Sequence, residues 1–345
     1  MVQIFFKKAS SKNNDPPNPC TQALRVKFKG YLPQFQIMVP KRIVSFLPSA
    51  TEILYQLGVG DQLVGVTHEC DFPDEAKSKP RVIHSSFDPT KMGSKEIDKQ
   101  VVDLMHSGGD IYLIDEQVLK KANPDLIVAQ GLCDVCSPSN KEISKAISIL
   151  NNKPEVVILD PHNIDDILAG IMEVAKKIGK ISEAEELIGS LRKRIEYVKS
   201  KSAKSRPKVL CIEWLDPLFT AGHWVPQMVE IAGGINGISV VGEPSRRMKI
   251  GEAMMFDPDI IVLMPCGFQI SRTKQEHFKL ARNSEWRSLR AARNNNVYAV
   301  DANSYFSKPG PRTVTGIEIL AKIFQPEKFE DLKIPEDSFI QINFD

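Results

Sequence analysis

Asn123-Pro124-Asp125-Leu126-Ile127-Val128 recurs later in the chain as Asp257-Pro258-Asp259-Ile260-Ile261-Val262. In each copy a turn that contains proline precedes a short aliphatic run, which is typical of a buried parallel strand. Each copy then runs into a loop that carries cysteine. The carboxyl ends of parallel strands share one edge of an open sheet, and ligands bind at that edge. The repeat therefore predicts two similar α/β halves whose cysteine-bearing loops face a common cleft.

The segments around the two copies alternate between strand-like and helix-like patterns. Residues 42–47 form an apolar run that stops at Pro48, and Ser49 with Glu52 has the spacing of a capping box for the next helix. Alternation of this kind predicts a mostly parallel sheet in each half. The expected strands are 42–47, 63–67, 126–129, 156–159, 208–213, 260–263 and 297–300, and the expected helices are 49–57, 94–105, 141–150, 163–178, 182–201, 225–232, 278–292 and 313–324.

Two consecutive helical patterns separate the halves. The second of them, Ser182–Lys201, would be roughly 30 Å long at about 1.5 Å per residue, which is the width of a small domain. We therefore expect two similar α/β lobes joined by a single long helix. The expected parts are a flexible leader (1–41), an N-terminal α/β lobe (42–162), a helical connector with the long bridging helix (163–204), a C-terminal α/β lobe (205–325) and a tail (326–345).

The composition excludes several classes of function. Among 345 residues, 45 Lys and Arg nearly balance 43 Asp and Glu, so no bulk charge attracts nucleic acid or an anionic membrane. No apolar run is long enough to span a bilayer, and the amino terminus lacks the apolar core of a secretory signal. We therefore expect a cytoplasmic protein with reduced cysteines. Phosphate-loop, dinucleotide, nucleophile-elbow and zincin motifs are absent, and whether the protein turns over a substrate stays open.

Cysteine, histidine and glutamate gather in loops that follow predicted strands. Thiolate, imidazole and carboxylate groups are ligands for zinc, and thiolates hold iron–sulfur clusters. A lone Cys-x-x-Cys pair is more often structural, and a single loop histidine is more often a hydrogen-bonding residue. The two loop glutamates could instead cap a helix or pair with Arg312. The candidate metal ligands are His68, Glu69, Cys70, Cys133, Cys136 and Cys266, with His223 as a second histidine and Glu213 as an alternate carboxylate.

Aromatic residues also concentrate in the loops of the second half. Flat apolar walls suit a flat, ring-shaped ligand, although the same side chains could pack as ordinary core between the halves. A loop at residues 305–312 adds a cation at its end. The candidate ligand-binding residues from this pattern are Trp214, Phe219, His223, Trp224, Phe268, Tyr305, Phe306 and Arg312.

The run RIVSFLPSATEIL at residues 42–54, with Leu57-Gly58 and Leu63–Val66 after it, resembles the start of vitamin B12- and iron–siderophore-binding proteins. The repeated Pro-Asp turns and the segment 217–234 fit the same pattern, so the resemblance covers about residues 42 to 325. These are class III substrate-binding proteins of ABC transporters, and the cobalamin-binding branch is the most similar. The resemblance implies two lobes with the ligand between them. It also implies that Phe72 and Phe219 help to hold a corrin ring.

Three hypotheses follow from these features. The first is a non-catalytic binder of cobalamin or another metal chelate, with His68 or His223 near the metal. The second is a zinc or iron–sulfur protein, an enzyme included, that uses the Cys, His and Glu ligands. The third is a structural or interaction protein with an inert cleft. Without an export signal, an ABC permease is a doubtful partner, and nucleic acid is not expected as one.

Overall fold

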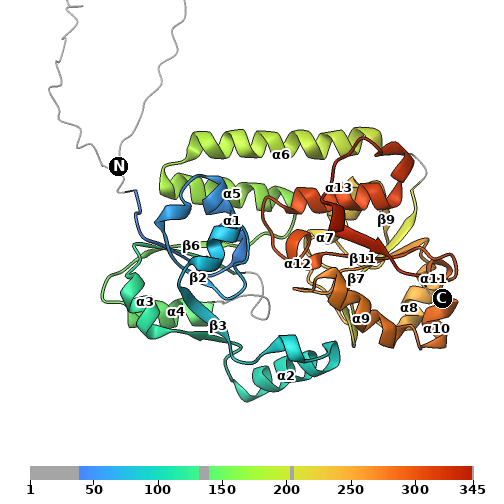
Figure 1. Cartoon of the computed structure of the whole chain (residues 1–345), viewed down its shortest axis with the longest axis horizontal. Helices are drawn as coiled ribbons and strands as arrows, with labels where there is room; N and C mark the ends of the chain where they lie inside the picture. The colour runs from blue at the N-terminus through green and yellow to red at the C-terminus, as the bar shows by residue number, and fades with distance from the viewer. Residues whose placement is uncertain (1–38, 132–139, 203–205, 344–345) are drawn as a thin grey trace, which may run out of the picture. The chain divides into compact units, whose positions relative to one another are not determined.

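Two β-sheets, each flanked by helices, form the part of the chain that the computed structural model describes, residues 39–131, 140–202 and 206–343. The first sheet has the strand order β4-β3-β2-β1-β5-β6, and the second has the order β12-β11-β10-β7-β8, with β9 beside β7. Their inner pairs are parallel, whereas β3–β4, β7–β8 and β11–β12 are antiparallel. The predicted two-lobed α/β fold is confirmed (Figure 1). We call the first sheet with α1–α4 the first lobe, and the second sheet with α7–α13 the second lobe.

The elements alternate along the chain as the sequence predicts. The strands are β1 (Ile43–Ser45), β2 (Leu63–Thr67), β3 (Arg81–Ser85), β4 (Tyr112–Ile114), β5 (Leu126–Gln130), β6 (Glu155–Leu159), β7 (Lys208–Leu215), β8 (Leu218–Thr220), β9 (Ile235–Asn236), β10 (Ile260–Leu263), β11 (Val297–Val300) and β12 (Phe339–Gln341). The helices are α1 (Pro48–Gln56), α2 (Ser94–Ser107), α3 (Glu116–Ala122), α4 (Asn140–Ile149), α5 (Ile164–Ile178), α6 (Ile181–Lys201), α7 (Val225–Ile231), α8 (Ile250–Phe256), α9 (Ile270–Leu280), α10 (Ser284–Ser288), α11 (Arg290–Arg293), α12 (Ala302–Tyr305) and α13 (Thr313–Phe324).

The repeated sequence segments build equivalent turns in the two lobes. Asn123 ends α3 and Asp257 ends α8, and both have a positive φ, of 39° and 50°. Asn and Asp enter this left-handed conformation more readily than most residues because their short polar side chains bond locally. Each turn then leads into a strand whose residues are all buried, β5 in one lobe and β10 in the other.

The aspartate in each repeat ties two neighbouring strands together at their starts. Asp125 accepts hydrogen bonds from the backbone N–H groups of Lys41 and Arg42, at 2.9 and 3.0 Å, just before β1. Asp259 accepts one from the backbone N–H of Lys208 at 2.8 Å, where β7 begins. These bonds satisfy donors that the parallel ladder leaves free at its edge, and they fix which residues pair. The repeat in the sequence is therefore a repeat in strand register.

The single helix expected at 278–292 is wrong, because α9 ends at Leu280 and two separate short helices, α10 and α11, follow it. The side chain of Asn283 accepts hydrogen bonds from the backbone N–H groups of Glu285 and Trp286, which starts α10 as a new helix.

The expected start of the first helix is also wrong. The helix α1 begins at Pro48 with Leu47 as its N-cap residue, so Ser49 and Glu52 lie inside the helix and make no capping box. Proline favours the first helical position because it has no N–H group to leave unsatisfied and its φ is already helical. Since the side chain of Glu52 does not cap the helix, it is available to pair with Arg312, which lies 260 positions later in the chain.

Two helices connect the lobes, and the longer of them is the predicted bridging helix. The helix α6 has 21 residues and packs on α5 and on α13 of the second lobe, as Figure 1 shows. One hydrophobic cluster contains Ile43 of β1, Ile171 of α5 and Val209 of β7, so a single apolar core reaches from one sheet to the other. The lobes are thus joined by shared core as well as by chain.

Several short elements have no clear sequence signal. These are β3, β4 and α3 in the first lobe, and β8, β9, α8 and α12 in the second. The strand β12 lies in the last twenty residues and pairs antiparallel with β11, where Tyr298 faces Gln341. In the ranges that the structure describes, no helix combines the length and apolar character needed to cross a membrane.

Candidate functional site

A loop of the first lobe meets a loop of the second lobe beyond the ends of β2 and β11. Asn303 donates to Asp71 at 2.8 Å, and Lys308 pairs with Asp71 at 2.9 Å. Lys308 also donates to the backbone carbonyl of Glu69 at 3.2 Å. Although burial opposes it, the Lys308 ammonium holds the pKa of Asp71 below its ordinary value. The structure thus brings together two loops that the sequence flagged separately.

Arg312 lies at the centre of this meeting point. Its guanidinium stacks 4.0 Å from the centre of the Phe72 ring and 5.7 Å from that of Tyr305. Its Nε donates at 3.0 Å to Glu52, whose side chain is only 2% exposed. Phe72 itself is 39% exposed, so one face of its ring is free to contact a ligand. Glu52 therefore fixes the position of the Arg312 guanidinium, and the guanidinium packs on the ring of Phe72.

A second aromatic group lies in the second lobe. The rings of Trp214 and Phe268 meet edge to face at 5.3 Å, and the guanidinium of Arg272 covers Phe268 at 3.8 Å. The indole N–H of Trp214 donates to the backbone carbonyl of Ser94 in the first lobe at 3.1 Å. Phe268 is buried, whereas Trp214 is partly exposed. Only Trp214 of this pair offers ring surface to a ligand.

Three of the predicted ligand-binding aromatic residues are buried in the hydrophobic core. Trp224, Phe268 and Phe306 are 5%, 2% and 3% exposed, and the Trp224 indole donates to the carbonyl of Phe306 at 3.0 Å. All three rings are buried, as the alternative of ordinary core packing requires. Phe219 in β8 is half-buried, with the Arg247 guanidinium 5.5 Å from its ring.

The two loop histidines lie in different surroundings. His223 has a positive φ of 53°, stacks on Trp224 at 5.7 Å and meets the ring of His162 at 6.3 Å. His68 is 6.2 Å from the ring of Tyr112. Burial lowers the pKa of both His68 and His223. Each imidazole is therefore neutral at neutral pH, with a lone pair on one nitrogen.

The predicted set of metal ligands is not assembled by the described residues. The Cys70 thiol is buried, lies 3.1 Å from the Thr51 hydroxyl and 3.3 Å from that of Thr67, and has a pKa raised by burial. Metals bind the thiolate form, so a buried thiol that stays neutral contributes to packing and does not bind a metal. Cys266 is partly exposed in the second lobe, and Cys133 and Cys136 lie outside the described residues. In residues 39–131, 140–202 and 206–343, no three His, Cys, Asp or Glu side chains group as a metal site.

The two loop glutamates that the sequence offered as metal ligands, Glu69 and Glu213, contact other groups in the structure. Glu69 is 44% exposed on its side chain and lies 4.0 Å from His68. Glu213 accepts a hydrogen bond from the backbone N–H of Gly222 at 3.2 Å. The partner of Arg312 is therefore neither of these residues but Glu52, which is separated from it by 260 positions.

Sequence reasoning missed the polar residues that join the loops. Lys308 is 7% exposed although it is a lysine, and it lies inside the segment Ser307-Lys308-Pro309-Gly310-Pro311-Arg312. The available signal was a lysine directly before Pro309-Gly310-Pro311, because proline restricts the backbone of such a loop. Asp71 and Asn303 carried no signal, because one carboxylate or amide in a loop is common on any protein surface.

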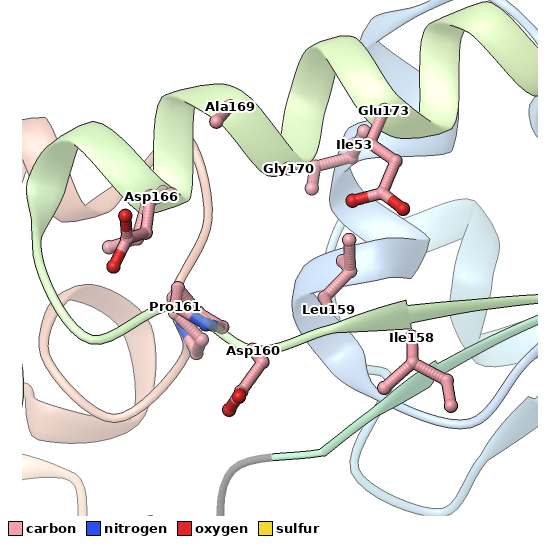
Figure 2. Close-up of a pocket in the computed structure, with 11 residues that line it drawn as sticks. Ile53, Ile158, Leu159, Asp160, Pro161, Asp166, Ala169, Gly170 and Glu173 are labelled. Atoms are coloured by element: carbon pink, nitrogen blue, oxygen red, sulfur yellow. The ribbon is translucent and has the colours of Figure 1, made fainter.

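A pocket of about 240 Å³ lies beside the same loop, between β6 and α5. Figure 2 shows the carboxylates of Asp160, Asp166 and Glu173 around it, with the aliphatic side chains of Ile158 and Leu159. Ligand pockets usually hold about 300–1,000 Å³ and are mainly apolar. This pocket is smaller than that and acidic, and none of the candidate aromatics lines it.

Comparisons with known proteins agree with this fold. The chain matches the family described as periplasmic binding protein over residues 43–304. An uncharacterized ABC transporter substrate-binding lipoprotein of Bacillus subtilis, YvrC, is 24% identical over 301 residues, which are 85% of this chain and 82% of that one. A vitamin B12-binding protein of Vibrio cholerae is 23% identical over 285 residues, covering 81% and 87%. The periplasmic heme-binding protein RhuT of Roseiflexus superposes with a TM-score of 0.63 at 19% identity, covering 84% and 99%.

These relatives correct two predictions from the sequence. The prediction of a cytoplasmic protein is wrong, because the relatives are periplasmic proteins or a lipoprotein, which points to a location outside the cytoplasm. The doubt about an ABC permease rested on that prediction and is not supported, since YvrC is named as an ABC transporter component. For the location of the protein, the lack of a recognisable secretory signal was weaker evidence than the similarity to these relatives. Since the family match spans most of the two lobes, the chain belongs to the periplasmic binding protein family.

Proposed function

We propose that this protein is the substrate-binding component of an ABC importer and that its ligand is a flat metal chelate, in the first place a corrinoid of the cobalamin type. The observation that carries the proposal is a set of partly exposed aromatic rings in both lobes: Phe72 in the loop after β2, Trp214 near the end of β7 and Tyr305 at the end of α12. Rings of this kind stack on a macrocycle and exclude water from its faces. The vitamin B12-binding relative from Vibrio cholerae supports the same ligand class.

The contacts around Phe72 favour binding without rearrangement of that residue. Its ring is stacked on Arg312, which the buried Glu52 holds in place. A side chain fixed before the ligand arrives loses little conformational freedom on binding, so more of the contact energy becomes affinity. The neutral imidazoles of His68 and His223 are candidate axial ligands for the chelated metal.

Charge favours a corrinoid over haem at the meeting loops. Haem carries two propionate groups, which are anions at neutral pH, whereas the side chains around a corrin ring are mostly uncharged amides. Arg312 stacks on Phe72 and Lys308 contacts the preceding residue, Asp71. Both cations are already paired, Arg312 with Glu52 and Lys308 with Asp71. A propionate would have to displace a carboxylate from one of these pairs, which is costly for the buried Glu52.

The test is equilibrium titration of the purified protein with cyanocobalamin and with haemin, followed by tryptophan fluorescence. We expect a Kd for the corrinoid at or below about 1 μM, and weaker binding of haemin. Phe72→Ala should weaken corrinoid binding about tenfold, which corresponds to about 1.4 kcal/mol. Phe278→Ala is the matched control, because Phe278 is an exposed aromatic on α9, with 66% of its surface accessible, and lies outside the proposed site. No binding of either chelate would contradict the proposal.

The proposal also names the partner. A substrate-binding component delivers its ligand to a permease in the membrane, so an ABC permease is the expected partner. No described group of side chains favours the alternative of a zinc or iron–sulfur enzyme.

A further inference from the structure

A segment of the first lobe is bound to the second lobe beside Trp214, one of the aromatic residues of the proposed ligand site. It comprises residues 89–98, which run from the turn Pro89–Lys91 through Met92 and Gly93 into the start of α2. We call this segment the strap. Figure 1 shows α2 below α9, on the opposite side of the two lobes from α6.

Arg272 of α9 holds the first part of the strap. Its guanidinium donates to the backbone carbonyls of Pro89 at 2.7 Å and of Met92 at 2.9 Å. The same guanidinium covers the ring of Phe268 at 3.8 Å. A planar cation with several donors can hold two carbonyls and an aromatic face at once, so Arg272 clamps the strap onto this ring.

Ser94 holds the middle of the strap. Its backbone N–H and its hydroxyl donate to Glu276 of α9, at 3.1 and 2.8 Å. Because Ser94 opens α2, this carboxylate also lies at the positive end of the helix dipole. The carbonyl of Ser94 accepts from the Trp214 indole at 3.1 Å, so the strap covers the polar edge of that ring.

An ion pair holds the last part of the strap. Arg247 donates to both carboxylate oxygens of Asp98, at 3.0 and 2.8 Å. Asp98 is 19% exposed and Arg247 is 57% exposed on their side chains, so salt can screen the pair. Arg247 also lies over Phe219.

We infer that the strap is a gate, which leaves the second lobe to admit a ring-shaped ligand to Trp214 and then returns to retain it. The inference rests on the proposed function, because Trp214 is one of the ring faces assigned there to the ligand. The helices α5 and α6 join the lobes by chain, whereas the strap and the contacts of Arg312 and Lys308 join them by noncovalent bonds alone. The ion pair of the strap is more exposed than the buried pair of Glu52 and Arg312, so the strap is the junction that can open while that buried pair stays in place.

Acrylamide quenching of tryptophan fluorescence in the ligand-free protein tests whether the strap covers Trp214. Trp224 and Trp286 are 5% and 0% exposed, so the quenching reports mainly on Trp214. Asp98→Arg places a cation against Arg247 and should at least double the quenching constant. Arg247→Asp should do the same, and the double variant D98R/R247D should return the constant to that of the unchanged protein. Arg246→Asp is the matched control, because Arg246 pairs with Glu252 inside the second lobe at 2.8 Å.

Stopped-flow association with cyanocobalamin tests the gate itself. Asp98→Arg should raise the association and dissociation rate constants about tenfold each, and the double variant should restore them. Glu276→Gln replaces Asp98→Arg if circular dichroism shows that the latter does not fold. Unchanged quenching in both single variants would contradict the claim that the strap covers Trp214. Increased quenching with unchanged rate constants would contradict the claim that the strap controls ligand entry and release. A protein that binds no chelate removes the proposed function, while the quenching series still decides whether the strap covers Trp214.

Discussion

At the residue scale, the pair of Glu52 and Arg312 shows how one buried contact organises the site. The side chains are 2% and 14% exposed. Arg312→Met should destabilise the protein by about 3–5 kcal/mol, because it leaves Glu52 buried without its cation. The double variant Glu52→Leu/Arg312→Met should recover most of that loss, since no charge then stays buried alone. Urea unfolding measures both, and equal losses in the single and double variants would contradict the role of the pair.

His277 gives the second residue-scale prediction, on the effect of pH. Its Nε2 accepts from the Trp286 indole at 3.1 Å, and burial lowers its pKa from 6.5 to about 4. Above pH 6.5 the imidazole is neutral in both the folded and the unfolded chain. As the pH falls from 6.5 to 4, the unfolded chain takes up a proton that the folded protein does not, so the free energy of unfolding falls.

The size of this pH effect can be measured against a variant. A difference of about 2.5 pKa units corresponds to roughly 3 kcal/mol, lost progressively between these pH values. In His277→Gln the amide oxygen can still accept from Trp286, but this residue no longer titrates. The difference in unfolding free energy between the two proteins should therefore change with pH in this range. A constant difference from pH 7 to pH 4 would contradict the assignment.

At the element scale, the junction between α5 and α6 depends on the conformation of one glycine. Gly179 ends α5 with a φ of 70°, and an added Cβ would lie 3.3 Å from Val39. Gly179→Ala should cost about 1 kcal/mol, because alanine is strained in the left-handed conformation. Gly189→Ala is the matched control within α6, where an added Cβ meets nothing within 4 Å. It should stabilise the helix by up to about 1 kcal/mol, and thermal unfolding of both variants gives the comparison.

At the scale of the whole molecule, the shared apolar core predicts that the two lobes unfold together. The cluster that contains Ile43, Ile171 and Val209 spans both sheets and the connecting helix. All three tryptophans, Trp214, Trp224 and Trp286, lie in the second lobe, so their fluorescence reports on that lobe, while far-ultraviolet circular dichroism reports on both. The two unfolding curves in urea should coincide. Separate midpoints would mean that the lobes are independent.

Sequence patterns predicted the larger part of the fold because those patterns act locally. The aliphatic runs at β5 and β10 and the turns at Asn123 and Asp257 need no information from elsewhere in the chain. The helix α13 lies at Thr313–Phe324, as expected, and α6 starts one residue before the expected Ser182. Shorter elements such as β12, with 3 residues, depend on a neighbouring strand and carry too little pattern of their own.

The candidate site could be predicted only in part. The sequence located the loop after β2 correctly, because strand ends follow from the strands, but it assigned Trp214 and Tyr305 to loops although they lie in β7 and α12. It did not separate Trp214, which is partly exposed, from Trp224, which is 5% exposed, since both are tryptophans ten positions apart in one predicted loop region. It also counted Cys70 among the candidate metal ligands, although the hydroxyl groups of Thr51 and Thr67 lie against that buried sulfur.

The sequence by itself determined the two α/β halves, the long helix between them and the family resemblance, because hydrophobic periodicity and turn residues fix local structure. Only the tertiary structure decided which charged groups pair between the lobes and which aromatic rings keep a free face. Glu52 and Arg312 are 260 positions apart, and Ser94 and Glu276 are 182 apart. Contacts over such separations depend on how the sheets and helices pack, and no pattern within a short stretch of sequence encodes that packing.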